Sequence, residues 1–346
     1  MMIPAFFDQI TRYGSLSVVG MAKNVGKTVC LRALLHRYRT PEKAAMLSVT
    51  SIGTDGESTD IVSQTAKPEL DFYPGMVVQT AEQYFFKRHL SAEILNVSRE
   101  STACGRLVTA RVKTPGKLII SGYTHTQGLR EYIRQAHGLG VKTAIIDGAL
   151  SRMSLASPFV SEAMILCTGA ALSKNMDELV RQTDFRYRLM NMPLFESVDG
   201  ERKALFENLK TGVHGMDTEG EIRNLEIPTL LQIDRYREKI EPYCKSGAFL
   251  YIAGLLNDSF LEFLSSKRQR PDLIVSDFTK FFFSDAAYRR FLRAGSRIWV
   301  LQQPRILGVC VNPFAPDGYR FNSAELREKM SAALDREVYD ILATEP

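Results

Sequence analysis

Short apolar runs alternate along most of the chain with segments whose apolar residues recur at helical spacing. Residues 16–19, 44–49 and 143–146 are apolar runs with the length of buried strands. Between the first two, Leu31, Leu34, Leu35 and Tyr38 fall on one face of a helix. This alternation predicts an α/β fold with a mostly parallel sheet and helices on both faces.

The same pattern predicts the remaining elements. Further strands are expected at 92–97 and 107–112, as a hairpin at a sheet edge, and at 117–122, 163–168, 248–253, 272–276, 297–301 and 306–311. Helices are expected at 75–90, 129–137, 176–190, 259–265, 286–292 and 323–334.

Residues 191–240 interrupt this rhythm, because glycines divide them into short mixed stretches without clear periodicity. We therefore expect three regions. They are a first domain at 1–190, a connecting or inserted β-rich region at 191–240, and a C-terminal α/β region at 241–346, which either extends the first sheet or forms a second domain.

Composition is that of an ordinary globular protein. The 346 residues are 45% hydrophobic and 24% charged, and the net charge of +5 is spread along the chain. The basic run at 267–270 reads as a solvated loop, so we expect no nucleic-acid partner. No apolar run approaches the 18 or more residues of a spanning helix, so we expect no membrane partner. The five cysteines form no close pairs and the start lacks a signal-like apolar segment, so a reduced, cytoplasmic protein is expected.

The strongest chemical signal is the loop from Gly20 to Thr28, Gly-Met-Ala-Lys-Asn-Val-Gly-Lys-Thr, between the first strand and the first helix. Such a loop directs backbone N–H groups and the helix dipole at a phosphate. Gly20, Asn24 and Gly26 would shape it, Lys27 would contact the β- and γ-phosphates, and the Thr28 hydroxyl would bind Mg²⁺. The glycines enclose five residues rather than the usual four, and an ordinary glycine-rich turn is the alternative.

Two acidic residues are candidates to serve the nucleotide and its metal. Asp55 follows the strand at 44–49, and Asp147 ends the strand at 143–146. Because parallel strands end at one sheet edge, both would face the phosphate loop. We expect both carboxylates to contribute to Mg²⁺ binding. We expect Asp55, together with Lys27, to act in catalysis as well. The alternative for Asp55 is that Asp55-Gly56 only forms a tight turn. Glu57, in the same loop, is a weaker candidate for the same role.

Several segments together resemble the small subunit of the lysine 5,6-aminomutase reactivase, over nearly the whole chain. They are Ala22–Thr28 (Ala-Lys-Asn-Val-Gly-Lys-Thr), Thr50–Glu57 (Thr-Ser-Ile-Gly-Thr-Asp-Gly-Glu), Ile146–Arg152 (Ile-Asp-Gly-Ala-Leu-Ser-Arg), Cys167–Ala170, Asp277–Lys280 and Asn312–Tyr319. In the fifth segment Phe278 stands where the family pattern is Asp-Pro-Thr-Lys.

The resemblance implies a P-loop protein that binds ATP and Mg²⁺ and acts with a MutS-like ATPase subunit. The complex would restore a cobalamin-dependent aminomutase by exchanging damaged cofactor, driven by nucleotide-dependent conformational switching. Two alternatives stay open. One is a stand-alone ATP-dependent enzyme acting on a small carboxylate, since dethiobiotin synthetases have a similarly lengthened loop. The other is a nucleotide-binding scaffold that does not hydrolyse ATP.

Overall fold

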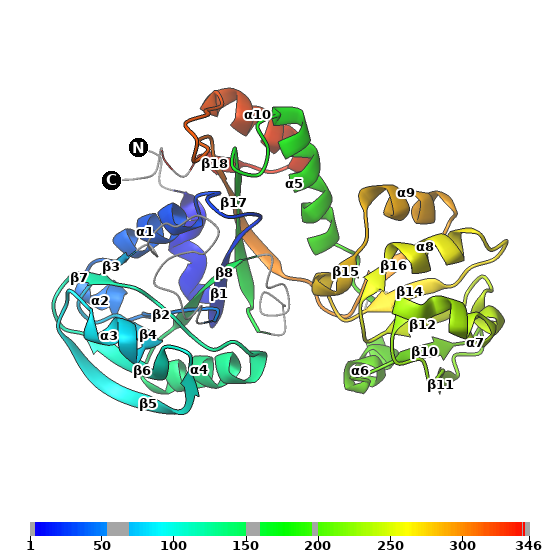
Figure 1. The fold of residues 1–346 in the computed structure, drawn as a ribbon, viewed down its shortest axis with the longest axis horizontal. Helices are drawn as coiled ribbons and strands as arrows, with labels where there is room; N and C mark the ends of the chain where they lie inside the picture. The colour runs from blue at the N-terminus through cyan, green and yellow to red at the C-terminus, as the bar shows by residue number, and fades with distance from the viewer. Residues whose placement is uncertain (1–3, 54–68, 150–159, 196–199, 341, 343–346) are drawn as a thin grey trace. The chain divides into compact units, whose positions relative to one another are not determined.

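The computed structural model describes residues 4–53, 69–149, 160–195, 200–340 and 342. The chain forms two compact units, which are described separately (Figure 1). The larger unit combines Met1–Asp184 with Pro304–Pro346, and the smaller unit is Phe185–Gln303. Helix α5 (Met176–Met190) runs across the boundary between them.

A nine-stranded sheet organises the larger unit, in the order β18-β17-β9-β1-β8-β2-β4-β6-β5. All neighbours from β18 to β4 are parallel, and β5 and β6 add an antiparallel hairpin at one edge. The strands are β1 (Ser15–Gly20), β2 (Leu47–Ser51), β4 (Val77–Ala81), β5 (Ala92–Thr102), β6 (Gly105–Val112), β8 (Thr143–Ala149), β9 (Ala163–Gly169), β17 (Arg305–Asn312) and β18 (Val338–Asp340).

Helices cover both faces of this sheet, as the alternation of side chains along β8 shows. Ile145 packs in one apolar cluster with Leu31 and Leu34 of α1 (Lys27–Arg37). The next residue, Ile146, packs in another with residues of α4 (Thr126–Gly138). Successive strand residues point to opposite faces, so α1 and α4 lie on opposite sides. The predicted α/β fold is confirmed, with a large mixed sheet.

Shorter elements complete the unit. They are the 3₁₀ helix η1 (Ala5–Arg12), α2 (Pro41–Ala44), α3 (Glu82–Phe86), α10 (Ser323–Leu334) and a small antiparallel pair formed by β3 (Leu70–Phe72) and β7 (Gly116–Leu118). Helix α10 packs against the edge strand β18.

The smaller unit has its own five-stranded sheet, in the order β11-β10-β12-β14-β16. Strands β12 (Phe249–Ile252), β14 (Asp272–Val275) and β16 (Ile298–Val300) are parallel, whereas β10 (Val213–Met216) and β11 (Ile222–Asn224) are antiparallel. Its other elements are α6 (Gly200–Asn208), η4 (Leu230–Tyr236), α7 (Arg237–Ile240), η5 (Glu241–Tyr243), β13 (Leu256–Asn257), α8 (Asp258–Ser265), η6 (Phe278–Lys280), β15 (Phe281–Phe282) and α9 (Asp285–Arg293). Its core contains Phe195, Phe206, Tyr251, Ile274 and Trp299.

Three sequence-based expectations differ from this structure. The helix predicted over 75–90 is wrong, because Val77–Ala81 forms the fully buried strand β4 and only Glu82–Phe86 is helical. The strand predicted over 117–122 is limited to Gly116–Leu118, which pairs with β3. The compact units also divide the chain differently from the predicted 1–190, 191–240 and 241–346, because β17 pairs with β9 and returns the last residues to the first sheet.

Among the described residues no helix combines the length and the apolar character that crossing a membrane requires.

Burial in the central sheet gives a first testable expectation. Ile145 of β8 is 0% exposed, whereas Ile94 of the edge strand β5 is 55% exposed. Ile145→Ala should lower the free energy of unfolding by about 2–5 kcal/mol, because it removes buried methylene groups and leaves a cavity. Ile94→Ala should cost less than about 1 kcal/mol. Urea denaturation followed by circular dichroism measures both, and equal costs would contradict the burial of β8.

Candidate functional site

The loop after β1 turns sharply into α1. Gly26, which precedes the first residue of α1, has φ 86° and ψ 12°, and Asn24 has φ 60°. This left-handed region is open to glycine and tolerated by asparagine, which explains both residue types. At Gly20 a Cβ atom would lie 3.0 Å from Val25 Cγ2 and 3.2 Å from the Ala22 carbonyl oxygen. The loop therefore needs a small residue at its start and, at its end, a residue that adopts the left-handed backbone conformation.

This turn leaves the start of α1 without a side-chain cap. Because Gly26 is the N-cap residue, it has no side chain to accept from the first N–H groups of the helix. These groups carry the positive end of the helix dipole. An anion in the loop would supply the missing acceptors.

Lys27 and Asp147 meet beside this helix start. Strand β8 lies next to β1 in parallel register, with Asp147 opposite Val18. Lys27 Nζ lies 2.7 Å from Asp147 Oδ1, an ion pair without aligned hydrogen-bond geometry, and the two side chains are 23% and 19% exposed. The structure thus brings together two residues that are 120 positions apart and that the sequence assigned to one site.

The end of β8 is also joined to the end of β2. The Asp147 carbonyl oxygen accepts hydrogen bonds from the Ile52 N–H at 3.0 Å and from the Ser51 hydroxyl at 3.3 Å. Thr28 lies half-buried in the first turn of α1. Asp55, the other predicted metal residue, lies outside the described residues, as do Glu57 and Arg152.

His125 has a structural role at the start of α4. It is the N-cap residue, and its Nδ1 accepts a hydrogen bond from the Gly128 N–H at 3.1 Å. Its Nε2 lies 2.9 Å from Glu100 Oε2. Both ring nitrogens are therefore used in holding α4 and the β5–β6 hairpin.

Other contacts hold the loop from the opposite side of β1. The Met21 N–H donates to the Cys167 carbonyl oxygen of β9 at 2.9 Å. At the end of β17, Asn312 Nδ2 donates to the Asn24 carbonyl oxygen at 3.3 Å. Sequence reasoning missed this role of Asn312, because the loop and Asn312 are 288 residues apart.

Three cysteines are buried together in the core beside the loop. Cys30 is on α1, and Cys167 and Cys310 are paired residues of β9 and β17. Cys30 Sγ lies 3.9 Å from Cys310 Sγ. The hydrogen bond with Cys167 lowers the pKa of Cys30, but the hydrogen bond with Cys310 and burial outweigh it and hold that pKa well above its usual value. The pKa values of Cys167 and Cys310 are also raised, by the hydrogen bonds with Cys30 and Cys167 respectively and by burial.

Among the described residues no group of three or more His, Cys, Asp or Glu side chains is arranged to hold a metal ion.

Comparisons with protein-family models, with curated proteins and with solved structures find no match for this chain.

The left-handed Gly26 gives a test of the loop conformation. Gly26→Ala should lower the free energy of unfolding by about 1–2 kcal/mol, because an L-residue with a Cβ is strained at this φ. Gly138→Ala is the matched control, since it lies at the end of α4 with nothing within 4 Å of the new Cβ. It should be neutral or stabilising by about 0.5–1 kcal/mol. Thermal and urea denaturation compare the two variants, and equal effects would argue against a left-handed Gly26.

Burial of the thiols predicts their reactivity. None of the five cysteines forms a disulfide; Cys30, Cys104, Cys167 and Cys310 are buried, and Cys244 is half-buried. At pH 8 the native protein should react with a thiol reagent at no more than one site, because four of the thiols are buried and the pKa values of Cys30, Cys167, Cys244 and Cys310 are raised. In denaturant all five should react. Rapid native reaction of three or more thiols would be inconsistent with the buried cluster.

Proposed function

We propose that the loop from Gly20 to Thr28 binds the phosphates of a nucleoside triphosphate, ATP in the first instance, with Mg²⁺. The observation that carries this proposal is the meeting of Lys27 and Asp147 at 2.7 Å beside the uncapped start of α1. An ammonium, a carboxylate and free backbone N–H groups in one place are the parts that a Mg²⁺–phosphate site requires. In this proposal the larger unit has a P-loop NTPase-like fold.

Each residue has a defined task in the proposed site. Lys27 would exchange its contact with Asp147 for oxygens of the β- and γ-phosphates. Asp147 and the Thr28 hydroxyl would then offer two oxygen ligands to Mg²⁺, a number that suits a metal also bound by phosphates and waters. Gly26 and Asn24 would maintain the loop geometry, and Asp55 would serve the metal and orient the attacking group.

The biological role we propose follows the resemblance described above. The chain would be the ATP-binding subunit of a reactivating complex with a MutS-like ATPase, acting on a cobalamin-dependent aminomutase. Loops that contact a γ-phosphate and its metal can be ordered by binding and released by hydrolysis. Such switching can open the aminomutase only to the extent that its two states differ in affinity for the complex. The sequence motifs support this role.

A stand-alone enzyme of the dethiobiotin synthetase type is the second candidate, favoured by the five residues between Gly20 and Gly26. It would use the γ-phosphate to activate a small carboxylate and would turn over without a protein partner. A scaffold that binds the nucleotide and leaves hydrolysis to its partner is the third.

Isothermal titration with Mg·ATP tests the phosphate site. Lys27→Ala should weaken binding by about 10- to 100-fold, because hydrogen bonds to charged groups contribute about 1.5–3 kcal/mol. Lys142→Ala is the control, since Lys142 is an exposed lysine that precedes β8 at the other end of the strand. It should bind as the wild type does. Absence of binding by the wild-type chain would refute the phosphate-loop proposal.

Hydrolysis assays then separate the three roles. ATP hydrolysis that rises only with the MutS-like subunit, and is lost in Lys27→Ala, supports the reactivating complex. Turnover without a partner in the presence of a small carboxylate supports the stand-alone enzyme. Binding without hydrolysis by this chain, with unchanged activity of the complex in Lys27→Ala, supports the scaffold.

A further inference from the structure

A shallow pocket of about 460 Å³ opens on the larger unit where β9 and β17 end. Its volume lies within the range of small-ligand sites. Two loops supply its walls, one following β9 and one following β17. The residues that shape it are Ala170, Ala171, Leu172, Ala315, Pro316 and Asp317.

Neighbouring strands and two hydrogen bonds link the pocket to the proposed phosphate site. Strand β9 lies beside β1, with Cys167 opposite Gly20, so Gly169 at the end of β9 lies about 7 Å farther along the strand direction than Gly20, at 3.3 Å per residue, and Ala170 follows it. The Ala170 N–H donates to the Asn312 carbonyl oxygen at 2.9 Å, and the Asn312 side chain donates to the carbonyl oxygen of Asn24 in the loop. One short network therefore joins the pocket wall to the phosphate loop.

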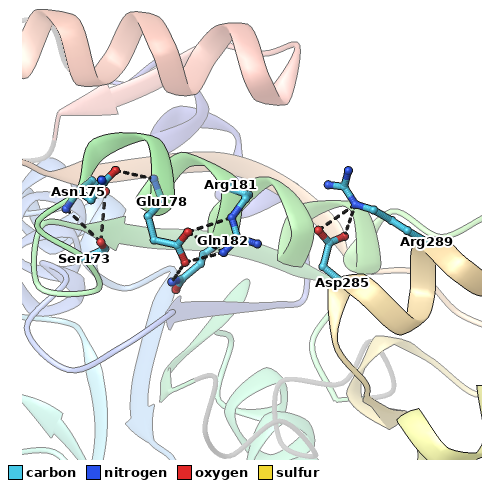
Figure 2. A network of polar contacts seen from close by, with 7 residues as sticks. All are labelled: Ser173, Asn175, Glu178, Arg181, Gln182, Asp285 and Arg289. Carbon is cyan, nitrogen blue, oxygen red and sulfur yellow. Dashed lines mark hydrogen bonds and ion pairs between the residues drawn. The ribbon is translucent and has the colours of Figure 1, made fainter.

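Hydrogen bonds fix one rim of the pocket before any ligand arrives. Ser173 Oγ donates to the Asn175 carbonyl oxygen at 3.2 Å and accepts from its N–H at 3.1 Å. Asn175 Oδ1 in turn accepts from the Glu178 N–H at 3.0 Å, in the first turn of α5 (Figure 2). The Glu178 carboxylate is held by Arg181 and Gln182 on the same helix (Figure 2). A preformed rim lowers the ordering cost of binding.

The lining combines small apolar side chains with one charged pair. Three alanines and a proline leave room for a flat ring to lie against the wall. At the open side Lys174 and Asp317 form an ion pair. The hydrogen bond from Lys174, followed by the backbone N–H of Tyr319, lowers the pKa of Asp317, so this carboxylate is an ionised acceptor at neutral pH. An apolar slot with one acceptor and one donor at its rim matches the face and the edge of a nucleobase.

We infer that this pocket holds the base of the nucleotide whose phosphates the loop from Gly20 to Thr28 binds. The inference rests on the proposed function and adds a base subsite to it. Ala170, Ala171 and Ala315 contact the ring, Asp317 accepts from an N–H group of the base, and Lys174 donates to a ring nitrogen or carbonyl oxygen. Binding of the base thus couples the loop after β17 to the phosphate loop through Asn312.

Isothermal titration of the full chain with Mg·ATP, Mg·GTP and Mg·tripolyphosphate tests this inference. Tripolyphosphate carries the phosphates without a base. In the wild type at least one nucleotide should bind ten-fold or more tightly than tripolyphosphate. The variant Ala171→Leu, which narrows the pocket, should weaken binding of that nucleotide at least ten-fold and leave tripolyphosphate unchanged.

Two further variants keep the test decisive. Ala92→Leu changes another partly buried alanine, on the edge strand β5. In the strand order β5 and the pocket lie on opposite sides of β1, so this variant should bind both the nucleotide and tripolyphosphate as the wild type does. Asp317→Asn leaves the pocket shape intact and should shift the ratio of ATP to GTP affinity about five-fold or more, with tripolyphosphate unchanged. If circular dichroism shows that Ala171→Leu does not fold, Asp317→Asn alone tests the base subsite.

The outcomes separate the two proposals. Equal affinity for tripolyphosphate and for both nucleotides, or equal effects of Ala171→Leu and Ala92→Leu, would overturn the base subsite and leave the phosphate site intact. If none of the three ligands binds to the wild type, the phosphate site is wrong and the base subsite is wrong with it.

Discussion

Parallel pairing on both sides of β1 is the constraint on which the larger unit depends. All six residues of Ser15–Gly20 are buried between β8 and β9, so both edges of the strand and both faces are occupied. Because parallel strands run in one direction, their carboxyl ends meet at one sheet edge. The loop after β1, the Asp147 carboxylate and the loops after β9 and β17 are neighbours for this reason alone.

Within this edge, a few backbone contacts determine the geometry of the candidate site. The left-handed Gly26 turns the chain into α1, and the contact between Met21 and Cys167 anchors the start of the loop. Asn312 anchors its middle from the far side. The buried cysteines fill the space where α1 packs against β9 and β17. Because the core is closely packed, a change in the volume of these side chains would displace the neighbouring loop.

Much of the architecture could be predicted from local pattern, and the differences have a physical cause. Helix α5 has the predicted bounds, and the β5–β6 hairpin lies at a sheet edge as expected, because each is specified by its own periodicity. The proximity of Lys27 and Asp147 is predictable from the sequence, because the carboxyl ends of parallel strands converge. The contact of Asn312 with the loop and the gathering of three cysteines depend on pairings more than 130 residues apart, which no local pattern encodes. The apolar residues at 75–90 suit a helix as well as a strand, and tertiary pairing with β2 and β6 makes Val77–Ala81 a strand.

The insertion of Phe185–Gln303 between two neighbouring strands has a consequence for synthesis on the ribosome. Strand β9 is complete at Gly169, but its partner β17 begins only at Arg305. At about 5–20 residues per second, β17 follows after roughly 7–27 s. During that interval β9, whose seven residues are all buried in the finished protein, is an apolar strand with one unpaired edge. The nascent chain therefore passes through a stage in which protection from intermolecular strand pairing must come from outside its own fold.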